Sequence, residues 1–434
     1  MEKKKIKLIY DAGALSYYYE KSSSRSGIFF VAYNILRELS KREDIEIVLY
    51  ADLDRLLAAK KFVKTHPEFQ HIKVLGKLTL FSRFLGSISY YRYKFRKIDK
   101  KDNLFKMIYR FFAIRIIRLY NEHQFFNKSL QKEIDNFDVY FSPNSAPPKV
   151  VFLNEKIKRF IFLHDTIPIV LQEYFHTMQI STTWFYKLFN SLNKTDYYFT
   201  NSEYTKSDFL KYSDKLNPDH VITALLGADE KFHPVCDEHK INEIKEKYSI
   251  PKDKRLILSL CTLEPRKNLV FAVKNFVKFI QKNNIEDCVF VLGGGHWQLF
   301  LKKIEDELSS LGDFKDKIIK TGYIEDEDLP ILYSAAESFV YPSLYEGFGM
   351  PVLEAMQCGC PVITSNRTSI PEVIADAGIQ INPEKDEELI SAYEKMYFDE
   401  SFRHECTRRG LERAKDFSWK KCVDIIVNTI GENL

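Results

Sequence analysis

The segment 341–363, YPSLYEGFGMPVLEAMQCGCPVI, constrains the fold of this chain most, because it connects a strand to a helix through a glycine-rich loop. The apolar run at 337–342 predicts a short buried strand, and two glycines within 346–349 permit a tight turn. Pro351 suits the first turn of a helix, which we expect over 350–358. The free N–H groups and positive dipole end of that helix would face the loop and favour an anion such as a diphosphate.

Two glutamates, Glu346 and Glu354, flank the start of this predicted helix at a spacing of eight. They can reach opposite ends of one ligand and accept hydrogen bonds from its hydroxyl groups. The alternative is that both are surface charges on an ordinary loop and helix, which is the usual role of an isolated pair. The strand, the glycine loop and the capped helix together favour a ligand site.

A second strand-to-helix connection carries a pair of cations. The apolar run 256–260 leads into the loop 264–268, EPRKN. Lys267 offers a compact charge and Arg266 a planar fork, and both suit the charge that develops on a leaving diphosphate. The alternative is a solvated basic pair on the surface.

The segments 288–295, 317–323 and 325–332 continue the order of a nucleotide-binding α/β domain, with strand, helix, strand, acidic turn and helix. The triplet 293–295, GGG, is not a G-x-G-x-x-G fingerprint that opens a helix, and no acidic residue follows at the distance that a dehydrogenase requires. A dehydrogenase is therefore the least favoured class of enzyme. A strand-end turn explains the triplet as well as phosphate contact does.

The first half of the chain also alternates strands with helices. It opens with a strand at 6–10, a helix that begins near Gly27, and a strand at 45–50, and further strands are expected at 138–141, 159–163 and 197–200. Both halves together predict an α/β protein.

These motifs resemble the retaining glycosyltransferases of family four, whose E-x7-E signature with an EGFG core is fully matched from Glu346 to Glu354. The resemblance implies the GT-B fold, with two Rossmann-like, doubly wound domains that face a cleft. The segment 221–234 is similar to the one before the family's interdomain linker. It implies an acceptor-binding domain over 1–234 and a nucleotide-sugar-binding domain over 235–434, with a last helix, about 418–432, that crosses back to the first domain.

The resemblance implies roles for the residues of the donor site. Glu346 would lie beside the reacting carbon of the donor sugar, and Glu354 would hold the ribose hydroxyls. Lys267 and Arg266 would stabilise the leaving diphosphate. Backbone amides that hold sugar and phosphate oxygens would come from Gly347, Phe348, Gly349 and Met350, and contacts to the base from Tyr323 and Ile324.

One departure from the family concerns the positive charge at this site. Many members carry an additional arginine directly after the strand, where this chain has Cys261 and Thr262. Arg266 would then supply the second positive charge.

The acceptor side is expected from the first half of the chain. Gly27 opens a helix whose N-terminus could face the donor diphosphate across the cleft. His164, before Asp165 at a strand end, stands where the family often has a histidine near the sugar or the acceptor, with a turn-capping pair as the alternative. Ser202 is expected to cap a helix, without a chemical role.

The predicted reaction is transfer of a sugar from a GDP- or UDP-linked donor to a hydroxyl of a glycan or lipid-linked acceptor, with retained anomeric configuration. The donor is a substrate, and no cofactor is expected. No Asp-x-Asp clamp is evident at a site position, so the resemblance predicts metal independence. A sugar-nucleotide epimerase and a non-catalytic sugar-nucleotide-binding protein on the same fold are the alternatives.

The seven cysteines show neither a metal spacing nor a disulfide framework, and the N-terminus lacks the apolar stretch of a signal peptide. We therefore expect a cytoplasmic protein.

The segment 77–120 differs from the rest of the chain, because aromatic residues alternate there with twelve Lys or Arg and only two Asp, whereas the whole chain carries +4. This pattern predicts a helix that lies on an anionic membrane, peripheral on its inner face, where a lipid-linked acceptor would be found. The alternative is core packing of the first domain. Nucleic acid is not expected, since no nucleic-acid module accompanies the segment. On a helical wheel an apolar face with basic flanks is formed by Leu104, Lys106, Ile108, Arg110, Phe111, Phe112, Arg115, Arg118 and Leu119.

Overall fold

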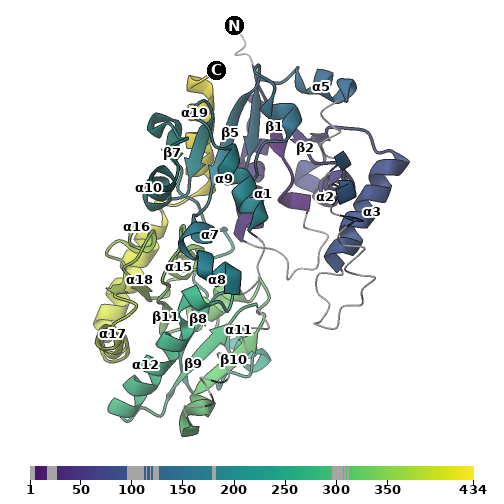
Figure 1. Cartoon of the computed structure of the whole chain (residues 1–434). Coiled ribbons are helices and arrows are strands. Elements are labelled where there is room, and N and C mark those ends of the chain that lie inside the picture. Colours follow the sequence, from purple (N-terminus) through teal and green to yellow (C-terminus); the bar gives the residue numbers. More distant parts are fainter. Residues whose placement is uncertain are drawn as a thin grey trace.

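Two parallel β-sheets, each covered by helices, make up the fold (Figure 1). The computed structural model describes residues 5–16, 27–94, 112–113, 115–117, 119–120, 127–177, 182–295, 306, 309 and 312–434. Every strand pairing recorded in these ranges is parallel. The predicted α/β class and doubly wound architecture are therefore confirmed.

The first sheet has the strand order β3-β2-β1-β4-β5-β6-β7. Strand β1 pairs with β2 on one side and with β4 on the other, so the winding direction reverses between β1 and β4. Ligands of such sheets bind beyond the carboxyl ends of the strands at this reversal. The strands are β1 Ile6–Asp11, β2 Ile45–Tyr50, β3 Lys73–Val74, β4 Val139–Ser142, β5 Lys158–Leu163, β6 Tyr197–Thr200 and β7 Val221–Thr223.

The second sheet has the order β10-β9-β8-β11-β12-β13, with its reversal between β8 and β11. The loops that carry the predicted donor residues leave these two strands at their carboxyl ends. The predicted boundary between 1–234 and 235–434 falls between the two sheets. The strands are β8 Arg255–Leu260, β9 Cys288–Gly293, β10 Ile318–Gly322, β11 Ser338–Tyr341, β12 Val362–Ser365 and β13 Ile379–Ile381.

Helices pack on the faces of both sheets because each has an apolar face to bury. Those around the first sheet are α1 Gly27–Ser40, α2 Leu56–Thr65, α3 Leu80–Lys94, α5 Lys128–Ile134, α6 Lys149–Phe152, α7 Ile167–Val170, α8 Gln172–Thr177, α9 Thr183–Ser191 and α10 Glu203–Tyr212. Those that follow are α11 Glu238–Lys247, α12 Leu269–Lys282, α14 Leu329–Ala335, α15 Met350–Gln357, α16 Ile370–Ile374, α17 Asp386–Phe398, α18 Glu400–Ala414 and α19 Trp419–Glu432. None of the helices in the described ranges is long and apolar enough to cross a membrane.

The last helix returns to the first domain, as predicted. α19 packs against α1, and Asp424 forms an ion pair with Arg42 at 2.8 Å. The apolar stripe that includes Trp419, Ile426 and Ile430 is buried in this contact. The chain therefore ends beside its first helix and ties the two domains together (Figure 1).

Candidate active site

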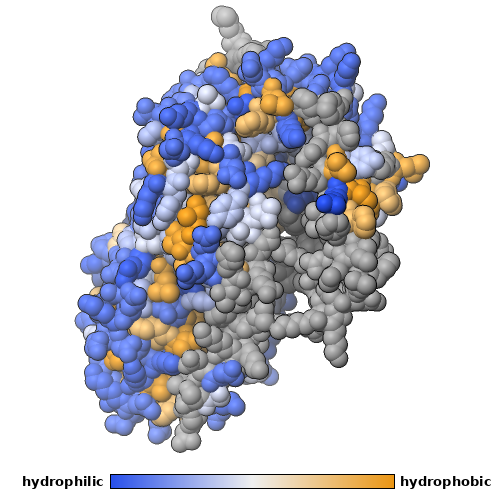
Figure 2. All heavy atoms as spheres, viewed as in Figure 1, coloured by the Kyte–Doolittle hydropathy of each residue, from blue (hydrophilic) through white to orange (hydrophobic). Residues whose placement is uncertain are grey.

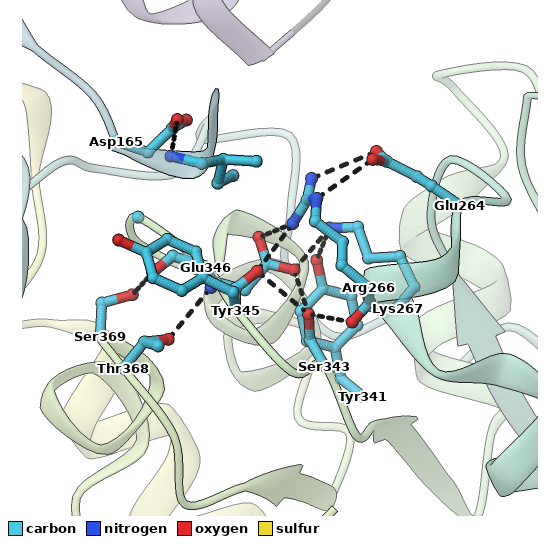
Figure 3. Close-up of polar contacts among 12 residues, drawn as sticks. Asp165, Glu264, Arg266, Lys267, Tyr341, Ser343, Tyr345, Glu346, Thr368 and Ser369 are labelled. Atoms are coloured by element: carbon cyan, nitrogen blue, oxygen red, sulfur yellow. Dashed lines mark hydrogen bonds and ion pairs between the residues drawn. The ribbon is translucent and has the colours of Figure 1, made fainter. Parts of the chain in front are cut away.

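Two loops meet at the carboxyl edge of the second sheet, where β8 and β11 are neighbours (Figure 3). The first loop contains a single 3₁₀ turn, Pro265–Lys267, and the second contains the EGFG sequence that leads into α15. Because β8 and β11 lie at the winding reversal, neither loop is covered by a crossover connection. Lys267 and Arg266 thus come to lie beside Glu346, although they precede it by 79 and 80 positions in the sequence.

Glu346 is the centre of this meeting point. Its two carboxylate oxygens bind different cations, with Lys267 Nζ 2.6 Å from Oε1 and Arg266 Nη1 2.7 Å from Oε2. Ser343 also donates to Oε1 at 2.6 Å. Glu346 is 7% exposed and Lys267 6% exposed, so this ion pair is almost fully out of water. The structure therefore brings together Glu346, Lys267 and Arg266, with Arg266 as the second cation.

The charge state of Glu346 follows from its surroundings. Burial acts to raise the pKa of its carboxyl, but Arg266 and Lys267 outweigh burial and lower that pKa to about 2. Removing either cation would leave a buried charge with less compensation, which is strongly unfavourable. Arg266 has a further partner, Glu264, at 3.1 Å, and Lys267 donates to the hydroxyl of Tyr341.

The turn that leads into α15 requires a glycine at position 349. Gly349 precedes the helix with φ at +107°, a conformation that side chains rarely adopt, and Pro351 occupies the first turn as predicted. Pro351 has no N–H and the Val352 amide donates to the carbonyl oxygen of Gly349 at 2.9 Å, so the amides of Gly349 and Met350 are the ones suited to phosphate oxygens. The side chain of Phe348, in contrast, packs edge-on against Phe417, so only the backbone of Phe348 could contact a ligand.

The first domain holds the EGFG loop through side chains at the start of α10 and within it. Ser202 caps α10 as predicted, and its hydroxyl also donates to the carbonyl oxygen of Gly347 at 2.8 Å. Thr205 donates to the same oxygen at 3.0 Å. The hydroxyl of Tyr345 bonds the buried carboxylate of Asp208. No local sequence pattern marks these contacts, which span 137 to 145 residues, so a site role was not predicted for Ser202, Thr205, Asp208 or Tyr345.

His164 lies at the end of β5 against the same loop. A Cβ atom at Gly347 would lie 2.2 Å from the carbonyl oxygen of His164, so only glycine permits this approach. The His164 Nε2 bonds the carbonyl oxygen of Pro143 at 2.7 Å, which assigns the proton to Nε2. Burial lowers the pKa of His164 to about 4. A neutral imidazole therefore presents Nδ1 as an acceptor.

Glu354 lies one turn inside α15. It accepts a hydrogen bond from the hydroxyl of the buried Tyr333 at 3.1 Å. Burial raises the pKa of the Glu354 carboxyl to about 7, although the hydrogen bond from Tyr333 and the charge of Lys231 oppose that rise. Tyr333 was not expected at the site, because a tyrosine in an apolar helix is usually a core residue.

The remaining predicted residues occupy different environments. Tyr323 is exposed, whereas the side chain of Ile324 is buried and packs beside Gly293, which leaves only its backbone for a base. Met350 is partly buried at the start of α15. Gly27 begins α1, and a Cβ atom there would meet no atom within 4 Å. In the described ranges no group of three or more His, Cys, Asp or Glu could hold a metal ion.

Comparisons with known proteins place this site in a family. Residues 240–413 match the family "Glycosyl transferases group 1". The O-antigen chain mannosyltransferase B of Escherichia coli is 31% identical over 291 residues, which are 67% of this chain and 73% of that protein. The chain belongs to the group 1 glycosyl transferases. The predicted transfer of a sugar from a nucleotide sugar is thereby confirmed, and the family favours it over the epimerase and binding-protein alternatives.

A further relative and two solved structures are also similar to this chain. The serotype-specific mannosyltransferase WbdA of Escherichia coli is 29% identical over 294 residues, which are 68% of this chain but 34% of WbdA. The crystal structure of HepE from Anabaena with UDP and glucose covers 98% of this chain and 100% of that chain, with a TM-score of 0.65 and 13% identity. WaaG, a glycosyltransferase of lipopolysaccharide biosynthesis, gives a TM-score of 0.62 at 14% identity, covering 98% of this chain and 99% of WaaG. The predicted GT-B fold is confirmed by these likenesses.

Proposed function

We propose that this group 1 glycosyl transferase moves a hexose, with mannose as the first candidate, from a nucleoside-diphosphate donor to a glycan hydroxyl in a bacterial surface polysaccharide. Transfer would retain the anomeric configuration and need no metal ion. The mannose assignment is supported by the Escherichia coli relatives, two of which are O-antigen or serotype-specific mannosyltransferases.

The proposal rests on the placement of two cations, the buried Lys267 and the partly buried Arg266, on one carboxylate. Lys267 and Arg266 lie 2.6 and 2.7 Å from the two carboxylate oxygens of Glu346. Cations that are already oriented stabilise charge on a leaving diphosphate without reorganisation. The free amides at the start of α15 would hold further phosphate oxygens, and Glu346 would orient the donor sugar while offsetting positive character at its anomeric carbon.

Two further residues have roles that follow from their protonation. Neutral His164 would accept a hydrogen bond from a hydroxyl of the donor sugar through Nδ1, because its Nε2 already bonds Pro143. Glu354 would accept hydrogen bonds from the ribose hydroxyls. Tyr323, exposed on the loop after β10, could stack on the base.

The test is a donor screen with product analysis. Purified protein is incubated with methyl α-mannoside as a hydroxyl acceptor and with GDP-mannose, UDP-glucose or UDP-N-acetylglucosamine as the donor, and release of the nucleoside diphosphate is followed with and without a chelator. We expect release from one donor, unchanged by the chelator, and the α-configured donor should give an α-linked product by NMR. A β-linked product would refute retention, and dependence on a divalent cation would refute metal independence.

We also propose that the protein contacts an anionic membrane through the segment 77–120. Figure 2 shows hydrophobic side chains at the right-hand edge of the first domain, over α3 in Figure 1. The exposed apolar side chains of this segment include Leu80, Phe84, Phe112 and Leu119. Exposed apolar groups beside basic ones favour an interfacial position.

The same segment also has an inner face. Leu85, Ile88, Ala113 and Ile117 form a small buried cluster, so part of its apolar surface is packed within the domain. Of the predicted amphipathic face, Phe112 and Leu119 are exposed along with Arg115. The other residues of that prediction, Leu104, Lys106, Ile108, Arg110, Phe111 and Arg118, lie outside the described residues.

Sedimentation with vesicles tests this contact. Wild-type protein should pellet with vesicles that contain phosphatidylglycerol and should be released by high salt, because screening weakens the attraction. Phe84→Ser should weaken pelleting, and so should the replacement of Arg110, Arg115 and Arg118 by Glu. Phe398→Ser is the matched control, since Phe398 is an exposed phenylalanine of α17 in the second domain. Absence of salt-sensitive pelleting would refute the contact.

A further inference from the structure

A cavity of about 400 Å³ lies at the carboxyl edge of the first sheet. Its walls come from the ends of β1, β2 and β4 and from the helices α1 and α9. The volume is within the range of small-ligand sites. The cavity occupies the winding reversal of its sheet between β1 and β4, as the donor residues do in the second sheet. Open parallel sheets bind ligands at this place.

Some polar side chains of the cavity are fully hydrogen-bonded within the protein, and others have hydrogen-bonding capacity left for a ligand. Asp11 is fixed, because its carboxylate accepts from the Gly13 amide at 2.7 Å, from Tyr140 at 2.5 Å and from Ser145 at 2.9 Å. The carboxylate of Asp52 accepts one hydrogen bond from the residues that the structure describes, from the hydroxyl of Tyr50 at 3.2 Å.

Two other polar side chains face the cavity with hydrogen-bonding capacity to spare. The side chains of Asn144 and Lys187 make no hydrogen bond to any residue that the structure describes. Together with Asp52 they offer a carboxylate oxygen, an amide and an ammonium group, so the cavity can both donate to and accept from hydroxyl groups.

An aromatic ring completes the wall. Trp184 is 48% exposed and precedes Lys187 by one turn of α9, so both side chains reach the cavity from one face of that helix. An exposed tryptophan combines a broad apolar surface with a polar N–H, which matches the apolar C–H face and hydroxyl edge of a pyranose ring.

The balance of charge favours a neutral ligand. The lining contains two carboxylates, Asp11 and Asp52, and two cations, Arg55 and Lys187. Sites for diphosphates present a surplus of cations or helix amides. A neutral polyhydroxyl compound therefore fits this cavity better than a second phosphate group.

The cavity adjoins the donor side of the cleft through two residues. Pro143 lines it, and the carbonyl oxygen of Pro143 bonds Nε2 of His164. The carbonyl oxygen of His164 in turn lies against Gly347 of the donor loop. A sugar in the cavity would therefore lie on the acceptor side of the same cleft.

From these contacts we infer that the cavity binds the terminal sugar of the glycan acceptor. Trp184 would pack on the face of the pyranose ring, while Asp52, Asn144 and Lys187 would hydrogen-bond its hydroxyls. The inference rests on the proposed function, because it names the acceptor side of the proposed reaction. None of these four residues was singled out by the sequence.

Binding is tested with the intrinsic fluorescence of Trp184. Methyl α-glycosides of mannose, glucose, galactose and N-acetylglucosamine are titrated into the full chain. At least one should change the fluorescence of the wild type, and Trp184→Phe should abolish that change. No sugar-dependent change in the wild type with any of the four would overturn the inference.

Kinetics separate acceptor binding from donor chemistry. Release of nucleoside diphosphate is measured in water alone and with the glycoside that binds. Trp184→Ala, Asp52→Asn and Lys187→Ala should each raise KM for the glycoside about tenfold, as expected for the loss of one buried contact, and leave release in water unchanged. Lys194→Ala, an exposed lysine outside the cavity, is the matched control for Lys187 and should change neither rate.

Different experimental results would contradict the proposed function and the proposed acceptor site. Absence of donor turnover in every protein would contradict the proposed function. Normal release in water with an unchanged glycoside KM in all three variants would overturn the acceptor site alone. A raised KM for the donor with an unchanged KM for the glycoside would assign the cavity to the donor and equally overturn the inference.

Discussion

Lys267→Ala should slow sugar transfer far more than it weakens donor binding. In the structure Lys267 is 6% exposed and its ammonium lies 2.6 Å from Glu346, so it acts in a site that excludes water. The charge on the leaving diphosphate grows toward the transition state, and loss of one oriented cation costs roughly 2 to 4 kcal/mol there. We therefore expect kcat to fall by about thirtyfold to a thousandfold, with a small change in donor affinity.

The remaining cation limits the damage to the fold. Arg266 stays 2.7 Å from the other oxygen of Glu346, so the carboxylate is not left without a partner. Because one of the charges that lower the pKa of Glu346 is gone, that pKa should rise in the variant. The acid limb of the rate profile should then move to higher pH.

The assay compares steady-state release of nucleoside diphosphate, donor affinity by calorimetry and thermal unfolding for the wild type and the variant. Lys247→Ala serves as a matched control, because Lys247 also forms an ion pair at 2.6 Å, with Asp328, but its side chain is 49% exposed. That control should leave kcat unchanged. A Lys267→Ala enzyme with near-normal kcat and an intact fold would refute the role given to this cation.

Four further substitutions distinguish the other site residues. Glu346→Gln should lower kcat with little change in nucleotide affinity, whereas Glu354→Ala should mainly weaken that affinity; the same defect in both variants would contradict their separate roles. Since the pKa of Glu354 is raised to about 7, its carboxylate forms as pH rises through that value, and calorimetry should show tighter nucleotide binding at pH 8 than at pH 6. Glu354→Gln should remove this dependence, and an unaltered pH profile would exclude Glu354 from ribose binding. Tyr345→Phe removes the hydrogen bond to Asp208. It should lower the free energy of unfolding by about 1 to 3 kcal/mol and reduce kcat, because the donor loop loses one of its contacts to the first domain. An unchanged free energy of unfolding and an unchanged kcat would show that this hydrogen bond does not position the loop.

The sequence by itself determined the local structure of the site. Gly349 and Pro351 specify a turn into a helix, because one tolerates a positive φ and the other suits a first helical turn. Ser202 specifies the start of α10 through its side-chain cap. Apolar runs of strand length, alternating with helices, specify two parallel sheets. These features depend on a few neighbouring residues, so a single chain reveals them, and the spacing of Glu346 and Glu354 then indicates the family.

Only the tertiary structure decided which of these elements meet. The order of strands in the second sheet makes β8 a neighbour of β11, and this brings Arg266 and Lys267 onto one carboxylate. The cavity beside Trp184 likewise depends on three strand ends and two helices that are far apart in the sequence. Hydrophobic periodicity states which face of a strand is buried but not which strand lies beside it, so such contacts follow from the packing of the whole chain.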